Sequence, residues 1–232
     1  MSGHSKWAQI KRKKGATDVK RGQRFSKLSK QLTIAARLGK NLDMAVAAAR
    51  AANMAKDTID RAIAKGTGAG ADSVQIEEAL YEAFGPGGTA ILISVLTDNK
   101  NRTMGELRTL AGKQGFTLAN SGAVRHLFEY YGILEVPAGP DPDATQLALI
   151  DLGAADVATE DEVIVGYFSP TSLDQARKAA ETAGLTVQSI RLGYVPKVQQ
   201  TISAEEQEKL VHILERIDEL DDVDSVETNA AL

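Results

Sequence analysis

Apolar residues in the first third of the chain recur with the spacing of helices. Between residues 16 and 38, the apolar positions are Phe25, Leu28, Leu32, Ala35 and Ala36. Steps of three and four residues describe one face of a helix, which Gly39 is suited to end. Helical patterns recur over residues 42–53 and 57–65, the second with Asp57 as a suitable N-cap. The first part of the chain is therefore expected to form a bundle of three helices.

The segment GTGAGAD, residues 66–72, separates this bundle from the rest of the chain. It is rich in glycine and lacks large apolar residues, which is typical of a flexible linker. A dinucleotide-binding loop needs a strand before its glycines and a different glycine spacing. We therefore interpret the segment as a linker.

Strand and helix patterns alternate beyond the linker. The expected strands are 80–84, 89–96, 124–131, 133–136, 156–159, 163–168, 186–194 and 223–226. The expected helices are 102–114, 143–152, 172–183 and 204–220. A capping box from Thr103 to Glu106 is expected to open the first of these helices.

The order of these elements predicts how the chain is divided. From residue 133 onward the order is βαββαβ, and the region before it lacks a last helix and strand, which the C-terminal tail supplies. We expect an α+β protein, with an N-terminal three-helix bundle followed by two ferredoxin-like βαββαβ-type domains, the second inserted in the first. The expected domains are a basic bundle with its linker (1–71), a discontinuous α/β domain (72–131 plus 203–232) and an inserted α/β domain (132–202).

Charge is divided unevenly along the 232 residues, although the whole chain has a net charge of only -4. Residues 1–65 hold 16 Lys and Arg against four Asp and Glu, a net of +12, and the remainder holds 11 against 27, a net of -16. A basic segment joined to an acidic remainder is typical of polyanion binding by the basic part.

The basic residues of this first segment are the main candidate site. A solvated helix face is the alternative, but such a face usually carries both signs, and no acidic residue lies between Lys20 and Leu42. We therefore expect these residues to bind nucleic acid. The candidates are Lys6, Lys11, Arg12, Lys13, Lys14, Lys20, Arg21, Arg24, Lys27, Lys30 and Arg37.

A second candidate site lies in the loop DNKNRT, residues 98–103. Here Lys100, Arg102 and Thr103 stand beside the free backbone N–H groups of an expected helix start, which suits an anion. An ordinary capped loop between strand and helix is an equally good interpretation.

Aromatic residues have two interpretations in this sequence. Trp7 either stacks on a base or pins the N-terminal arm to the bundle, and we favour the pin. Phe128, Tyr130 and Tyr131 are reminiscent of RNA-recognition sheets, but the signature of that module is absent, so we expect them to be core residues.

The sequence lacks the residues or motifs that several classes of function require. The chain contains no cysteine, which excludes disulfides, thiolate zinc sites and cysteine nucleophiles. No nucleotide-binding, zinc-protease or nucleophile-elbow motif occurs, and the acidic segment DELDDVDSVE lacks the pattern of a calcium loop. We expect no enzyme, metal or cofactor. Because no apolar segment reaches membrane-spanning length, we also expect a cytoplasmic protein without membrane contact.

Three stretches of the sequence resemble the YebC/PmpR family: MSGHSKWAQIKRKKGATDVKRGQRFSKL, YEAFGPGGTAILISVLTDNKNRT and SGAVRHLFEYYG. The mitochondrial translational activator of cytochrome oxidase belongs to the same family. The resemblance implies a helical domain and two α/β domains. It also implies either a DNA-binding transcriptional regulator or a ribosome-associated factor that assists synthesis of proline-rich stretches. The chain departs from the family at GKNLDMAVAAARAANM, where relatives have a longer loop with an Asn-Pro-x-Leu-Arg-like element.

The sequence thus predicts a non-enzymatic regulator of gene expression that binds nucleic acid through its first domain. Ribosomal RNA is the first expected partner and promoter DNA the alternative, because a basic stripe alone does not distinguish the two. A small-molecule-sensing or catalytic α/β protein is a third hypothesis. A monomer is favoured.

Overall fold

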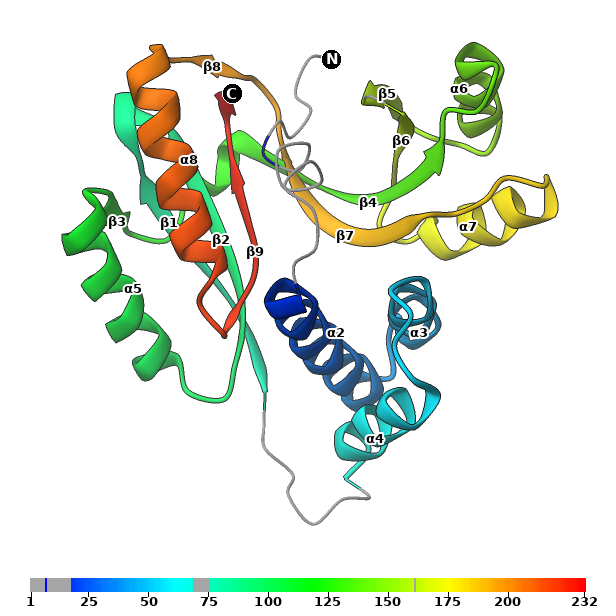
Figure 1. Cartoon of the computed structure of the whole chain (residues 1–232), viewed down its shortest axis with the longest axis horizontal. Coiled ribbons are helices and arrows are strands. Elements are labelled where there is room, and N and C mark those ends of the chain that lie inside the picture. The colour runs from blue at the N-terminus through cyan, green and yellow to red at the C-terminus, as the bar shows by residue number, and fades with distance from the viewer. Residues whose placement is uncertain (1–6, 8–17, 69–75, 161) are drawn as a thin grey trace.

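The computed structural model describes residues 7, 18–68, 76–160 and 162–232, with the side chains of residues 18–21 left aside. Three units are arranged around a common centre (Figure 1). The helical unit comprises α2 (Asp18–Leu38), α3 (Leu42–Ala51) and α4 (Lys56–Gly66), and it lies against two units built on β-sheets.

The helical unit has the amphipathic pattern that the sequence predicts. Its core is formed by small and medium-sized apolar side chains: Leu32, Ala49, Met54, Ile59 and Ala62. Phe25 and Leu28 pack against this core from α2, partly buried, which confirms the expected inward face. Gly39 follows α2 with a φ of 62°, a left-handed conformation that glycine adopts without strain, so it ends the helix as expected.

The first sheet unit is discontinuous in sequence. It contains β1 (Glu77–Phe84), β2 (Ala90–Thr97), α5 (Lys100–Gln114) and β3 (Thr117–Ala119), followed much later by α8 (Ala204–Asp218) and β9 (Val223–Thr228). The strands are antiparallel in the order β3-β1-β2-β9. Both helices lie on one face of this sheet (Figure 1), where Leu107, Leu210 and Leu214 are fully buried. The tail therefore completes this unit, as the sequence predicts.

The second sheet unit is inserted between β3 and α8. It contains β4 (Phe128–Pro137), α6 (Pro142–Asp151), β5 (Asp156–Glu160), β6 (Val163–Phe168), α7 (Leu173–Thr182) and β7 (Ser189–Pro196). Its strand order, β5-β6-β4-β7, is that of the expected βαββαβ arrangement. In the first sheet unit the β1–β2 hairpin is central instead, so the two sheets differ in strand order. Short elements complete the chain: η1 (Pro86–Gly88), η2 (Arg125–Leu127), β8 (Gln200–Thr201) and β10 (Ala230–Ala231).

Two predicted element boundaries are wrong. The strands expected at 124–131 and 133–136 are one continuous strand, β4, so the expected domain boundary after residue 131 lies inside it. Gly132 pairs with both neighbouring strands and so lies within β4, and glycine is needed there because an added Cβ would lie 2.7 Å from the Cβ of Leu173 in α7. The capping box at Thr103 is wrong as well, since α5 begins at Lys100 and the side chain of Asn99 accepts the cap hydrogen bonds.

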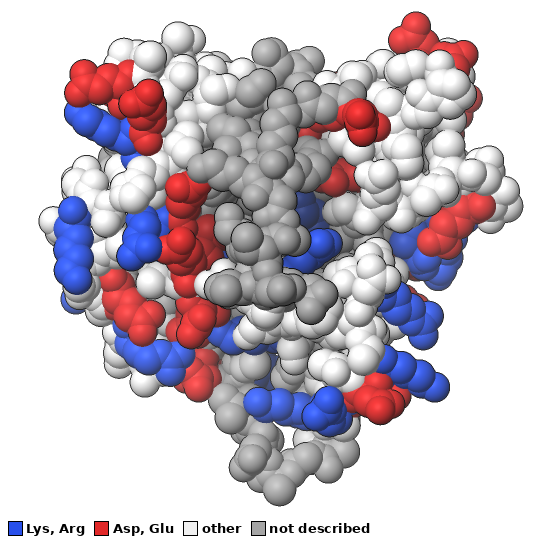
Figure 2. All heavy atoms as spheres, viewed as in Figure 1, with Lys and Arg blue, Asp and Glu red and all other residues white. Residues whose placement is uncertain are grey.

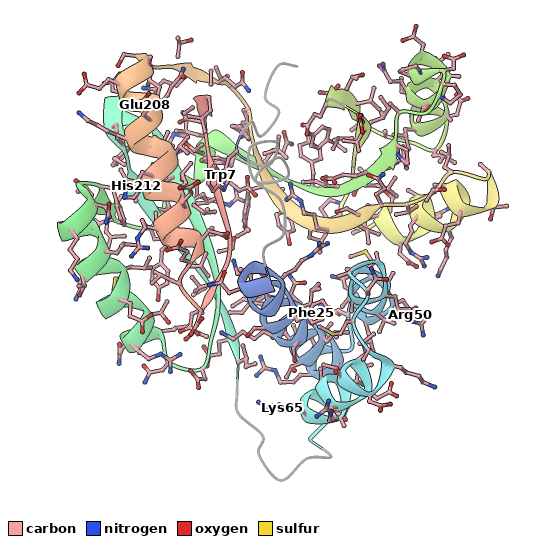
Figure 3. The ribbon with its side chains drawn as sticks, viewed as in Figure 1. Trp7, Phe25, Arg50, Lys65, Glu208 and His212 are labelled. Atoms are coloured by element: carbon pink, nitrogen blue, oxygen red, sulfur yellow. The ribbon has the colours of Figure 1, made fainter. Side chains whose placement is uncertain are left out.

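Trp7 anchors the chain to the first sheet unit. It is only 4% exposed and belongs to the core cluster of that unit, which includes residues of β2 and α8; its position is labelled in Figure 3. The sequence predicts a pin rather than a stacking platform, and this is confirmed, but the partner is the first sheet unit and not the helical bundle. The hydrophobic pattern of the sequence does not reveal which unit Trp7 packs against, because the core around Trp7 is built from residues far apart in the chain, from 83 to 230.

We expect Trp7→Phe to lower the free energy of unfolding by only about 1 to 2 kcal/mol. In the described part of the structure the buried indole Nε1 has no hydrogen-bond partner, so phenylalanine keeps most of the apolar contact and loses no hydrogen bond. Urea unfolding followed by circular dichroism measures the change. A loss above about 3 kcal/mol would show that the indole N–H has an acceptor in solution.

Candidate nucleic-acid interface

The predicted basic residues fall into three groups in the structure. Lys6 and Lys11 to Lys14 lie outside the described residues. Lys20 and Arg21 belong to the first turn of α2. Arg24, Lys27, Lys30 and Arg37 follow along α2, and only for these four does the structure describe side-chain surroundings.

The four described cations of α2 do not share one environment. Arg24 is exposed. Lys27 and Lys30 instead face the first sheet unit, where they form ion pairs with Asp218 at 2.8 Å and Asp222 at 2.9 Å. The guanidinium of Arg37 donates a hydrogen bond to the backbone carbonyl of Ile76. The structure therefore separates Arg24 from the other three cations.

Those three cations belong to a continuous stripe of α2, which we call the docked stripe: Lys27, Lys30, Gln31, Ile34 and Arg37. Steps of three and four residues place them on one face of the helix. Ile34 is buried with Ile76 and Leu96, an apolar contact between α2 and the first sheet unit. This stripe is thus a face that packs on the rest of the protein.

Asp222 is the centre of the polar contacts at this junction. Its side chain is 5% exposed, and it follows α8 just before β9. Four donors reach its two oxygens: Lys30 Nζ at 2.9 Å, Thr97 Oγ1 at 3.0 Å, Arg102 Nη2 at 2.6 Å and Thr103 Oγ1 at 2.8 Å. One carboxylate thereby joins the helical unit to β2, α5 and the C-terminal part of the first sheet unit.

The ionisation of Asp222 follows from these contacts. Burial on its own raises the pKa of the carboxyl, but hydrogen bonds from Lys30, Arg102 and the two threonines favour the charged form more strongly. The pKa of Asp222 is therefore held well below the usual range of an aspartate, and the group is ionised at neutral pH.

The second predicted site is brought together only in part. Arg102 and Thr103 both contact Asp222, so the anion at this helix start is a carboxylate of the protein itself. Lys100 forms a separate ion pair with Glu77 at 2.6 Å, and this hydrogen bond lowers the pKa of the glutamate. The interpretation as a loop that anchors its own structure accounts for every described contact of these three side chains.

Further cations lie on the outer surface of the helical unit and were not among the candidates. They are Lys40, Arg50, Lys56, Arg61 and Lys65, all exposed. Arg50 lies on the side of the unit away from the first sheet unit, and Lys65 lies on α4 at the lower end of the molecule (Figure 3); basic side chains are visible along this lower and outer edge (Figure 2). Exposed Asp57 and Asp60 are interspersed with them on α4. Their scattered positions give no run in the sequence, so only their placement on the helices could have identified them.

The aromatic residues predicted to lie in the core differ in how exposed they are. Phe128 is 1% exposed, as expected of a core residue, but Tyr130 is 38% exposed, so its assignment to the core is wrong. Its ring centroid lies 4.7 Å from that of Tyr194 on the neighbouring strand, and the Arg125 guanidinium lies 4.5 Å from the Tyr194 ring. Strand alternation places Phe128 and Tyr130 on the same face of β4, so the sequence pattern does not separate them. Phe128 is covered because it packs in a cluster with Leu92 of β2 and Val124.

A cavity between Lys27 and the chain after α8 has a volume of about 10 Å³, enough for one water molecule. Within the described ranges, no group of histidine, aspartate or glutamate side chains is arranged to hold a metal ion. None of the helices formed by these residues is long and apolar enough to cross a membrane.

Comparisons with known proteins agree with this architecture. The family model of the TACO1/YebC protein N-terminal domain matches residues 5–69, and that of the TACO1/YebC second and third domain matches residues 76–230. A crystal structure of a conserved hypothetical protein from Aquifex aeolicus is 36% identical and superposes with a TM-score of 0.85, covering 92% of this chain and 91% of the other.

Relatives with similar sequences extend over the whole chain. A protein of Trichlorobacter lovleyi is 39% identical, with 99% of this chain and 95% of the relative covered. A protein of Treponema denticola is 42% identical, with 99% and 96% covered. Both are named probable transcriptional regulatory protein. The chain therefore belongs to the TACO1/YebC family.

Proposed function

We propose that this protein is a non-enzymatic regulator of gene expression that binds nucleic acid through its first 65 residues. The observation that carries the proposal is the separation of charge, with a net of +12 in this segment and -16 in the remainder. Such a segment is attracted to the phosphate backbone, while the acidic remainder disfavours adhesion of the sheet units to the same polyanion.

The described helices support contact with phosphates rather than reading of bases. A recognition helix needs a free face of side chains that enters the major groove. The docked stripe of α2 lies on the first sheet unit, while Met44 of α3 is buried in the core of the second sheet unit. The exposed side of α4 carries both signs of charge. Specificity would then come from the shape of the partner, which favours structured RNA.

Ribosomal RNA is accordingly our first choice of partner, and the resemblance noted above suggests assistance in the synthesis of proline-rich stretches. The names of the relatives favour a second candidate, a transcriptional regulator that binds promoter DNA. Co-sedimentation with ribosomes, set beside titration of promoter and random duplexes at the same salt concentration, distinguishes the two. Retention on ribosomes with no preference between duplexes is the result expected for the translational role.

Arg24 allows a sharper test because its side chain is described and exposed. We expect Arg24→Ala to weaken binding about three- to tenfold near 0.15 M salt, equally for different sequences, and to reduce the salt slope by roughly 0.7 to 0.9. The matched control is Arg108→Ala, which changes an exposed residue of α5 in the acidic first sheet unit. Sequence-selective loss with an unchanged slope would instead identify a base contact and favour the DNA-binding role.

A further inference from the structure

The docked stripe of α2 faces a second feature that we call the acidic edge, residues 218–224, which runs from the last residue of α8 into the first residues of β9. We propose that the docked stripe is a phosphate-binding site that the acidic edge occupies in this structure, and that a bound polyanion displaces the acidic edge from it. This inference rests on the proposed function and adds a regulatory contact to it.

The contacts across this junction are those that a phosphate would make. Lys27 Nζ lies 2.8 Å from Asp218 Oδ1 and 3.1 Å from the Asp218 carbonyl. Lys30 Nζ lies 2.9 Å from Asp222 Oδ1, and Gln31 donates to Asp224 at 2.7 Å. In these described contacts the groups on α2 are donors, and their partners are carboxylate or carbonyl oxygens. Nucleic-acid phosphates present anionic oxygens to the same kind of donor.

The opposing charges match the division of charge along the chain. No acidic residue lies between Lys20 and Leu42, while the acidic edge contains Asp218, Glu219, Asp221, Asp222 and Asp224 without any Lys or Arg. The two segments are 191 residues apart in sequence where Lys27 meets Asp218. The acidic edge therefore stands where a polyanion would bind, and the two compete for Lys27 and Lys30.

The helical unit is held differently on its two sides. Toward the first sheet unit, the apolar cluster of the described residues is small and consists of Ile34, Ile76 and Leu96. The side chains of Lys27 and Asp218 are 15% and 21% exposed. The partly exposed Lys27–Asp218 pair contributes little and is screened by salt. Asp222 is nearly buried, but when Lys30 leaves, Arg102 and the two threonines still donate to this carboxylate. Toward the second sheet unit, Met44 is buried in an apolar core. The polar junction is therefore the side that opens, while α3 remains in place.

A cross-link across the junction tests the inference in the full chain. Because the protein has no cysteine, Gln31→Cys with Asp224→Cys introduces the only two thiols, which a short bis-maleimide can join. We expect the cross-linked protein to bind structured RNA about tenfold or more weakly than the unreacted variant. The salt slope should also fall by roughly 0.7 to 0.9 for each of the two lysines withheld.

The matched control is Glu205→Cys with Lys209→Cys, a pair joined by a 2.6 Å ion pair within α8, treated with the same reagent. Its cross-link should leave binding unchanged. If the α2 cross-link also leaves affinity and salt slope unchanged, Lys27 and Lys30 do not need to leave the acidic edge and the inference is wrong. If the unreacted chain fails to bind nucleic acid, the proposed function itself fails, and the inference with it.

Removal of charge from the acidic edge provides an independent measurement. We expect Asp218→Asn with Asp224→Asn to raise affinity for structured RNA about two- to fivefold, as competition for the stripe weakens. Asp143→Asn with Asp151→Asn, on exposed positions of α6, removes the same charge elsewhere. Equal gains from both pairs would show general repulsion instead of competition at the stripe and would overturn the inference.

Discussion

Asp222→Asn is expected to lower the free energy of unfolding by about 3 to 5 kcal/mol, the cost of removing one partner from a buried charged network. The carboxylate is 5% exposed and is the shared acceptor for Arg102 and Thr103. An amide keeps the shape but replaces one acceptor oxygen with a donor, which faces donors already in place. Urea unfolding measures the change, and the single tryptophan, Trp7, reports on the same sheet unit through its fluorescence.

Asp221→Asn is the matched control for this prediction. The neighbouring residue is exposed, and its described contact with Lys30 uses the backbone carbonyl, which the substitution leaves in place. Its effect should stay within about 0.5 kcal/mol. Equal destabilisation by the two variants would mean that loss of charge, rather than loss of this network, controls stability.

The low pKa of Asp222 makes the same contribution dependent on pH. Because the folded-state pKa lies below the unfolded value of about 3.9, the stabilisation is fully present above about pH 5. It is lost as the pH falls further, through the folded value. The difference in unfolding free energy between the wild type and Asp222→Asn should therefore be constant from about pH 5 to 7 and shrink below pH 4. A difference that stays constant into that acidic range would contradict the assignment.

Local patterns were sufficient to predict the longer helices and strands and their nesting, but not the short strands β3, β8 and β10. The three- and four-residue spacing in α2 predicts Leu32 and its neighbours as the inward face, and the structure confirms it. The missing helix and strand of residues 72–131 predict that α8 and β9 complete the first sheet, also confirmed. These features depend on periodicity and element order, which single sequences carry.

Contacts between distant segments could not be predicted in the same way. The cations of α2 suggest a free polyanion site, but Ile34 on the same stripe indicates a packed face, and its partners Ile76 and Leu96 lie beyond the linker. A local motif also misled at Thr103. Its hydroxyl donates to Asp222, 119 residues away, whereas Asn99 caps the helix. A polar residue held by tertiary contacts has the same local sequence as one that caps a helix.

The four consecutive cations Lys11 to Lys14 are expected to make the largest contribution to nucleic-acid binding. Replacing all four by alanine should weaken binding about a thousandfold at 0.1 M salt. Each lost phosphate contact reduces the slope of log affinity against log salt concentration by roughly 0.7 to 0.9, so four lost contacts reduce it by about 3. Between 1 M and 0.1 M salt, a tenfold difference, this change in slope corresponds to about a thousandfold loss of affinity. Filter binding or fluorescence anisotropy with structured RNA and with duplex DNA, each over a salt series, measures both quantities.

A matched variant replaces four exposed cations of the two sheet units by alanine: Arg108, Lys113, Lys178 and Lys197. It removes the same net charge from the acidic part of the chain, so long-range attraction falls equally while no proposed phosphate contact is lost. If both variants lose affinity to the same extent, net charge rather than a basic contact surface controls binding. If only the replacement of Lys11 to Lys14 lowers the salt slope, and does so equally on RNA and duplex DNA, the run contacts phosphates without reading bases. Discrimination between the two nucleic acids must then come from the shape presented by the rest of the protein.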